Sequence, residues 1–316
     1  MSVERVATNS QAQFLLNQIM QAEQRLNLSQ QQVASGKLSS DYAGVGDKTS
    51  ALEAARASAA RADAYHANTQ AALNQVDLQD NQISQLASAA DQLKQAMMTA
   101  LGDNDATGFM NAVKGIFDQA AQILNAKDAN GDYLFGGDKN DQPPFNVTSL
   151  AQLAGLSDVS QAFSNGTLKK TVMVGDGQPV EIGVLASDIG TQIMQTLKDI
   201  ASFDAGPTGG FSGTLTAAQS NFLSQEMPVA DDAATGLNLS AAANGDVYKR
   251  LTEASDQQTA LSTLYKGFVS NLEDADMPTA VSQLNQNQTA LQAALQVTSQ
   301  LGQLSLLNFL PVNPNG

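Results

Sequence analysis

The sequence contains no cysteine and no tryptophan, and only 5% of its 316 residues are aromatic. Disulfides, thiolate nucleophiles and cysteine metal sites are therefore excluded. The first proline is Pro143, so no proline interrupts a helix in the long segment before it. With 42% hydrophobic residues but few large rings, the apolar positions are mainly Ala, Leu, Val and Ile, which favours close helix–helix packing.

Positive charge is also scarce, because 16 Lys and Arg face 31 Asp and Glu and leave a net charge of −15. Phosphate binding needs clustered Lys and Arg, so the composition argues against nucleic acid as a partner. No stretch approaches the roughly 20 apolar residues of a membrane span, so we expect no membrane insertion. The first residues contain no charged segment followed by an apolar run, and we expect no cleaved signal peptide.

Patterns typical of catalysis or metal binding are missing as well. The single histidine, His66, lies in an Ala-rich segment and is expected to be an ordinary helix residue, not a general base. The segment DANGDYLFGGDK (128–139) begins like a calcium loop, but Tyr133 replaces the turn glycine and Lys139 replaces the bidentate glutamate. We predict no enzymatic activity, no cofactor and no bound metal.

What the chain does contain is helical periodicity at both ends. Ile19, Leu26 and Val33 recur every seven residues, and Leu16 precedes them by three. Such spacing places one apolar stripe on a helix. Stripes with similar steps predict further helices at 48–101, 109–123, 247–272 and 284–304. The stripes alone are consistent with an ordinary helical bundle or with a coiled coil in which the N- and C-terminal segments pair.

Polar residues dilute the outermost stripes. Glu23 and Gln30 occupy stripe positions beside Ile19 and Leu26, and the last helix is rich in glutamine. Half-apolar stripes are too weak to order isolated helices in water, because helix nucleation is costly. We therefore expect the two ends to be disordered alone and to fold when they meet neighbouring chains.

The helical period fades between residues 142 and 213. The segment TVMVGDGQPVEIGV (171–184) alternates apolar and polar residues around Asp176-Gly177, which predicts a hairpin. The segment 187–201 predicts a short amphipathic helix, and 204–213 predicts a loop. This block is expected to form a small α/β insert. The segment YLFGG (133–137) precedes it and predicts a turn into the insert.

Three segments resemble one family of bacterial proteins. QQVASGKLSSDYAGVGDK (31–48) is similar to a turn shared by flagellins and hook-associated proteins. NGDYLFGGDKNDQPPF (130–145) resembles a corner typical of the hook-associated protein 3 group. NLEDADMPTAVSQLNQNQTALQAALQVTSQLGQLSLLNFL (271–310) resembles the C-terminal signature of that group. The resemblance covers the first 140 and the last 80 residues, approximately, and not the central block.

This resemblance implies a mainly α fold in which long N- and C-terminal helices pair as coiled coil and bundle around a small α/β insert. A terminal assembly domain would comprise 1–47 and 278–316, and a helical bundle domain would comprise 48–141 and 214–277. Residues 142–213 would form an outward-facing insert domain. The terminal segments would line the core of a tubular assembly.

The function implied by the resemblance is that of a structural subunit at the junction between the flagellar hook and filament. Implied partners are copies of the same chain, hook-associated protein 1, flagellin, an export chaperone and the type III export apparatus. The implied location is the extracellular flagellum. Two alternatives remain: a flagellin of the filament itself, and a cell-surface adhesin or glycan-binding module that acts through residues 142–213.

Two groups of residues are the candidate functional sites. The predicted assembly interface consists of apolar residues from both terminal helices: Leu16, Ile19, Leu26, Val33, Leu284, Leu291, Leu295, Leu301, Leu304, Leu306 and Leu307. The predicted domain hinge consists of Phe135, Gly136 and Gly137. Phe135 is expected to pack on the bundle, while the glycines permit the positive φ needed for the turn.

Overall fold

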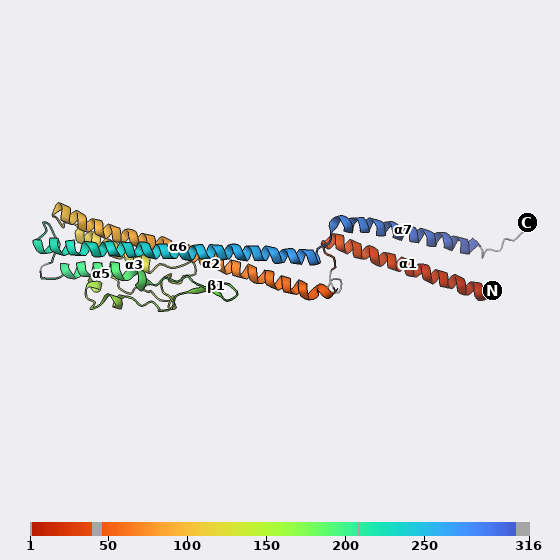
Figure 1. Cartoon of the computed structure of the whole chain (residues 1–316), viewed down its shortest axis with the longest axis horizontal. Coiled ribbons are helices and arrows are strands. Elements are labelled where there is room, and N and C mark those ends of the chain that lie inside the picture. The colour runs from red at the N-terminus through yellow and green to blue at the C-terminus, as the bar shows by residue number, and fades with distance from the viewer. Residues whose placement is uncertain (1, 40–45, 208, 308–316) are drawn as a thin grey trace, which may run out of the picture. The chain divides into compact units, whose positions relative to one another are not determined.

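The computed structural model describes residues 2–39, 46–207 and 209–307, and helices dominate it (Figure 1). The described elements, in chain order, are α1 (Ser2–Ser35), η2 (Gly46–Lys48), α2 (Thr49–Asp103), α3 (Phe109–Leu124), α4 (Leu150–Ala154), η3 (Val159–Ala162), β1 (Thr171–Gly175), β2 (Gln178–Glu181), α5 (Ala186–Asp204), α6 (Ala217–Glu273) and α7 (Met277–Leu307). The mainly helical fold with paired terminal helices is confirmed.

The chain divides into two compact units, and α2 and α6 run through both. Unit 1 comprises residues 1–60 and 261–316. In this unit α1 and α7 lie side by side and run in opposite directions, so the two ends of the chain come together (Figure 1). Pro278 is the second residue of α7. The N–H groups of the first helical turn have no partner within the helix, so a proline, which has no N–H, is tolerated there.

Unit 2 comprises residues 61–260 and contains the main core. One buried cluster joins apolar side chains of α2, α3, α5 and α6 with the segment between α3 and α5. The stripe predicted at 109–123 is buried along α3, and Ile193 and Leu197 of α5 are fully buried in the same cluster. Side chains from the insert therefore share one core with the flanking helices, while the expected division into three domains stays a prediction.

The predicted hairpin is confirmed as the antiparallel pair β1–β2, which turns at Asp176-Gly177. Gly177 has φ 67°, a conformation that glycine adopts without a steric penalty. Val174 and Val180 face a small buried cluster with Leu73 and Val76 of α2. The hairpin is thus attached to the helices through its apolar face.

Two polar contacts add to this attachment. The side chain of Gln258 donates to the carbonyl of Val174 at 2.9 Å, and the Tyr65 hydroxyl donates to Asp176 at 2.7 Å. Both contacts join the hairpin to the long helices of unit 2.

In the described part of the chain, no helix is both long enough and apolar enough to cross a membrane.

Candidate functional site: the paired terminal helices and their linkers

The contact between α1 and α7 follows a heptad pattern. On α1 the less exposed positions advance in steps of four and three, and on α7 in steps of three and four, as expected for helices that pack along one seam. The seam residues of α1 are Leu15, Ile19, Ala22, Leu26, Ser29 and Val33, and those of α7 are Leu284, Asn287, Leu291, Ala294 and Thr298. Most are only half-buried, because two helices alone cannot cover an apolar stripe.

A polar pair lies within this seam. The Asn287 side-chain amide donates a 2.7 Å hydrogen bond to the Ser29 hydroxyl, which donates in turn to the carbonyl of Arg25 at 3.0 Å. Ser29 is buried. A buried polar group that has one correctly placed partner favours one register over the others, because any shift leaves it without that partner. This pair was not predicted from the sequence, although both positions fall on the heptad steps.

The predicted interface residues fall into three groups. Ile19, Leu26, Val33, Leu284 and Leu291 lie in the seam. Leu16 and Leu295 are 60% and 49% exposed and stay uncovered within one chain. For the remaining four the structure describes the helical backbone but not the side chains, so their contacts lie outside what it describes: Leu301, Leu304, Leu306 and Leu307.

The terminal pair also exposes other apolar side chains. Phe14 on α1 is 62% exposed, and Val297 on α7 is 47% exposed. Met20, Leu28 and Val281 are exposed as well. Isolated exposed residues are normal on a protein surface, but these accompany a seam that is itself only half-covered. The terminal pair therefore keeps much apolar surface that a second chain could bury.

The linkers that adjoin these helices contact each other. Gly36 ends α1 with φ 71°, and its N–H donates to the carbonyl of Gln32 at 2.9 Å. The Leu38 N–H donates to the Glu273 carbonyl at 2.7 Å, and the Ala275 N–H donates to the Gly36 carbonyl at 2.8 Å. Two of the segments that carry the family resemblance, 31–48 and 271–310, thus meet here.

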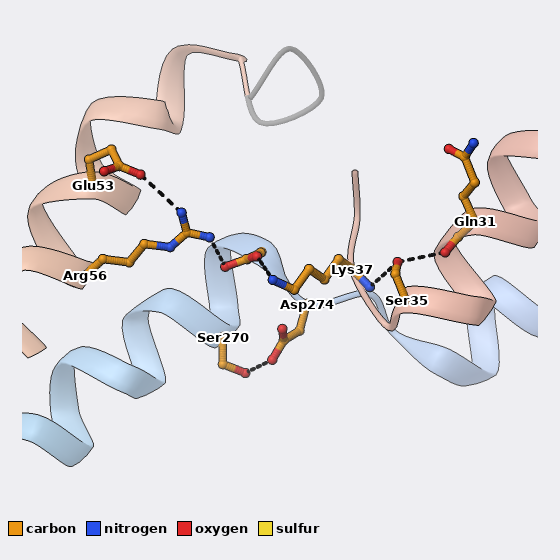
Figure 2. Close-up of polar contacts among 8 residues, drawn as sticks. Gln31, Ser35, Lys37, Glu53, Arg56, Ser270 and Asp274 are labelled. Carbon is orange, nitrogen blue, oxygen red and sulfur yellow. Dashed lines mark hydrogen bonds and ion pairs between the residues drawn. The ribbon is translucent and has the colours of Figure 1, made fainter. Parts of the chain in front are cut away.

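Charged side chains reinforce this contact (Figure 2). The Glu273 carboxylate pairs with the Lys37 ammonium through one oxygen and with the Arg56 guanidinium, at 2.6 Å, through the other. Arg56 also pairs with Glu53 at 3.1 Å. The hydrogen-bonded contact with Lys37 is the largest cause, and that with Arg56 the next, of a Glu273 carboxyl pKa below its ordinary value of 4.5. We call Glu273, Lys37 and Arg56 the carboxylate clasp.

Neighbouring hydrogen bonds fix the two linkers themselves. The Ser35 hydroxyl donates to the Gln31 carbonyl at 2.7 Å and accepts from the Lys37 backbone N–H at 3.2 Å. On the other linker, the Ser270 hydroxyl donates to Asp274 at 2.5 Å. Both serines thus hold the ends of their helices where the clasp residues can meet (Figure 2).

The predicted hinge residues lie at a tight corner in unit 2. Phe135 is fully buried in the main cluster. Gly137 has φ 66°, as expected for a turn glycine, and a Cβ there would lie 2.7 Å from Leu185. Gly136 does not have a positive φ. It is needed for space, since its Cβ would lie 2.6 Å from the Lys139 carbonyl. Their role as a hinge stays a prediction.

No group of three or more His, Cys, Asp or Glu side chains within the described segments is placed to hold a metal ion. Glu226 of α6 has one buried carboxylate oxygen without a hydrogen-bond partner. Burial, and secondarily the charge of Asp199, raise the pKa of the Glu226 carboxyl. The candidate site described by the structure is the set of contact surfaces on the terminal helices and their linkers.

Comparisons with known proteins agree with the resemblance read from the sequence. The family described as bacterial flagellin C-terminal helical region matches residues 227–310. Flagellar hook-associated protein 3 of Salmonella typhimurium is 24% identical over 265 residues, which are 75% of this chain and 78% of that protein. The protein of the same name from Escherichia coli K12 is 22% identical over 262 residues, with the same coverage.

Solved structures show the same fold. A flagellar hook-associated protein from Vibrio parahaemolyticus superimposes with a TM-score of 0.60 at 13% identity, over 73% of this chain and 100% of that chain. FlgL of Bacillus cereus superimposes with a TM-score of 0.50 at 16% identity, over 68% of this chain and 98% of that chain. The resemblance to the flagellin and hook-associated protein 3 group is therefore confirmed by sequence and by fold.

Proposed function

We propose that this chain is a structural, non-enzymatic subunit of the bacterial flagellum that forms the junction between hook and filament. The observation that carries this proposal is the likeness to flagellar hook-associated protein 3, which extends over 75% of the chain and 78% of that protein. A match to the flagellin C-terminal region alone would fit a filament subunit equally well. The longer likeness favours the junction.

The surface of the terminal pair supplies a physical basis for assembly. Leu16 and Leu295 are exposed within one chain, and the seam between α1 and α7 is half-covered. Burying apolar surface stabilises association by about 25 cal/mol per Å² before ordering costs are subtracted. Copies that repeat one such contact around an axis form rings or helical tubes.

The partners in this proposal are further copies of the chain, hook-associated protein 1 on one side and flagellin on the other. A dedicated chaperone would cover the apolar C-terminal helix before export. The type III apparatus would export the chain to the extracellular flagellum. A chain without cysteine suits passage in an unfolded state, because it cannot form disulfides on the way.

A single substitution tests whether the exposed face is an assembly contact. Leu295→Asp places a charge on α7 at a side chain that is 49% exposed, so it should leave the pairing of α1 with α7 within the chain intact. We expect the variant to be made and exported but to be missing from purified hook–filament structures. Immunoblots of sheared flagella and of the medium measure this.

The neighbouring substitution Gln296→Asp is a matched control, because it adds the same charge at an exposed polar position. It should be incorporated at normal levels. If Leu295→Asp is also incorporated normally, Leu295 is not part of an assembly contact and the proposed interface is wrong at that position.

Gene deletion separates the junction protein from a filament flagellin. Without a junction subunit, flagellin should be exported but should fail to polymerise and should accumulate in the medium. Without a sole flagellin, the hook and its junction proteins should remain on the cell with no flagellin outside. The second result would favour the filament alternative.

A further inference from the structure

The two linkers next to the terminal helices are joined by short backbone contacts that lie near the surface. The hydrogen bonds from Leu38 to Glu273 and from Ala275 to Gly36 form no extended sheet. Lys37 and Asp274 pair only as an isolated bridge. Backbone hydrogen bonds that water can replace add little stability. Something else must keep the linkers together.

The Glu273 side chain is placed to do so, because it joins its own helix to two other parts of the chain. It belongs to the last residue of α6, and it pairs with Lys37 on the linker after α1 and with Arg56 on α2. Its side chain is 10% exposed, whereas those of Lys37 and Arg56 are 48% and 36% exposed. The anion is thus the covered member of the clasp.

We propose that Glu273 is a charge-dependent latch: while its carboxylate is ionised the two linkers are joined, and when it is neutral they separate although unit 2 remains folded. A neutral Glu273 would lose its ion pairs with Lys37 and with Arg56, which are the charge interactions that join the linkers. Glu53 would still accept from Arg56, and Asp274 is held by the Ser270 hydroxyl.

The pH dependence follows from the sign of the shift. Because the pKa of Glu273 is lowered in the folded chain, the latch contributes stability above the ordinary value of 4.5 and loses it as the pH falls through the lowered pKa. Acid should therefore open the linkers first. The raised pKa of Glu226 has the opposite sign: its contribution to the stability of unit 2 is complete below 4.5 and is lost only as the pH rises through the raised pKa, so acid does not weaken unit 2 through this group.

Hydrogen exchange of single amides, measured by NMR on the full-length monomer, tests the proposal. The reporters are the Leu38 and Ala275 amides, whose hydrogen bonds join the linkers, and the Ala106 amide, which bonds to Gly213 in unit 2 at 2.8 Å. In Glu273→Gln at pH 7, protection of Leu38 and Ala275 should fall at least about tenfold while that of Ala106 is unchanged. In the wild type the same loss should appear below pH 4.5.

Glu253→Gln is the matched control, because it removes an exposed carboxylate from the same helix and should leave all three amides protected. Unchanged protection of Leu38 and Ala275 in Glu273→Gln would overturn the latch. A parallel loss at Ala106 would overturn it too, because the residue would then stabilise the whole fold instead of the linkers. Neither result depends on whether the chain assembles at the hook.

Discussion

Asn287 of α7 and Ser29 of α1 are joined by a 2.7 Å hydrogen bond although 258 residues separate them in sequence. Residues on either side of this pair in the seam are apolar, so the pair is a polar island in a half-covered stripe. This pair distinguishes the observed alignment of α1 and α7 from one shifted by a heptad, because a shift separates the two partners.

The double variant Ser29→Ala/Asn287→Leu should keep the helices paired but let them adopt more than one register. Replacing a buried polar pair by apolar groups is often neutral or stabilising, whereas the specificity of alignment is lost. Because the chain has no cysteine of its own, one cysteine can be introduced at an exposed position of α1 and one at an exposed position of α7, and spin labels then attach only there. Distance distributions in assembled, spin-diluted protein should change from one peak to several.

Gln286→Leu is the control for this experiment, because it adds an apolar side chain at an exposed position beside Asn287. It should retain the single distance of the wild type. A single, unchanged distance in the double variant would show that the apolar residues alone set the register.

The corner at Gly136 and Gly137 should be intolerant of any side chain. Gly137→Ala combines a positive φ of 66° with a Cβ 2.7 Å from Leu185 and 2.9 Å from the Leu168 carbonyl. We expect a loss of about 2–3 kcal/mol in the free energy of unfolding. Gly136→Ala should cost a similar amount, because the atoms nearest its Cβ are backbone. Urea denaturation measures both.

Gly245→Ala is the matched control, and we expect it to raise the free energy of unfolding instead of lowering it. Gly245 lies inside α6, and a Cβ there would meet nothing within 4 Å. Alanine should therefore stabilise the helix by about 1 kcal/mol. If Gly137→Ala proves neutral in the same assay, the corner relaxes easily and its close contacts do not constrain the fold.

Much of this architecture could be predicted from periodicity. Steps of three and four residues located α2 and α3, and the Asp176-Gly177 turn located the hairpin. These are local signals, because each depends on the spacing of residues within one element. The resemblance supplied what local signals could not, namely that the two ends of the chain pair.

The contacts between distant segments could not be predicted in detail. Leu16 precedes Ile19 by three residues and was expected to face α7, but Leu15 lies in the seam and Leu16 is exposed within one chain. The place of Leu16 in the assembly interface stays a prediction. A step of three and a step of four are equally helical, so a single stripe does not decide between them. The clasp between Lys37 and Glu273 was missed because isolated charged residues give no periodic signal.

Glu226 should make the stability of unit 2 depend on pH. The Glu226 carboxyl lies near Asp199, whose two oxygens each accept a 2.8 Å hydrogen bond from the Gln195 amide, and the charge of Asp199 adds to burial in raising the pKa of Glu226. Because the pKa of Glu226 is raised, its favourable contribution is complete below the ordinary value of 4.5 and is lost as the pH rises through the raised pKa.

Glu226→Gln keeps the shape of the side chain without its charge. We expect the melting temperature of unit 2 to rise by about 2 °C at pH 8 and to be unchanged at pH 4, relative to the wild type. Differential scanning calorimetry at the two pH values measures this. Glu253→Gln, at an exposed position, should show no difference at either pH. An equal effect of Glu226→Gln at both pH values would mean that packing, not charge, is responsible.

The ends of the chain should be open to protease in the monomer and protected after assembly. The α1–α7 seam is half-covered and its outer face carries exposed Phe14, Leu16 and Leu295, so one chain alone buries too little apolar surface to hold the pair firmly. We expect proteinase K to remove about 40 residues from each end of the monomer and to stop near the linkers at Lys37 and Glu273, where the clasp resists local opening. Mass spectrometry of the surviving fragment locates the cuts. A full-length chain that resists digestion would show that the terminal pair is stable by itself, and assembly would then need another driving force than folding of the ends.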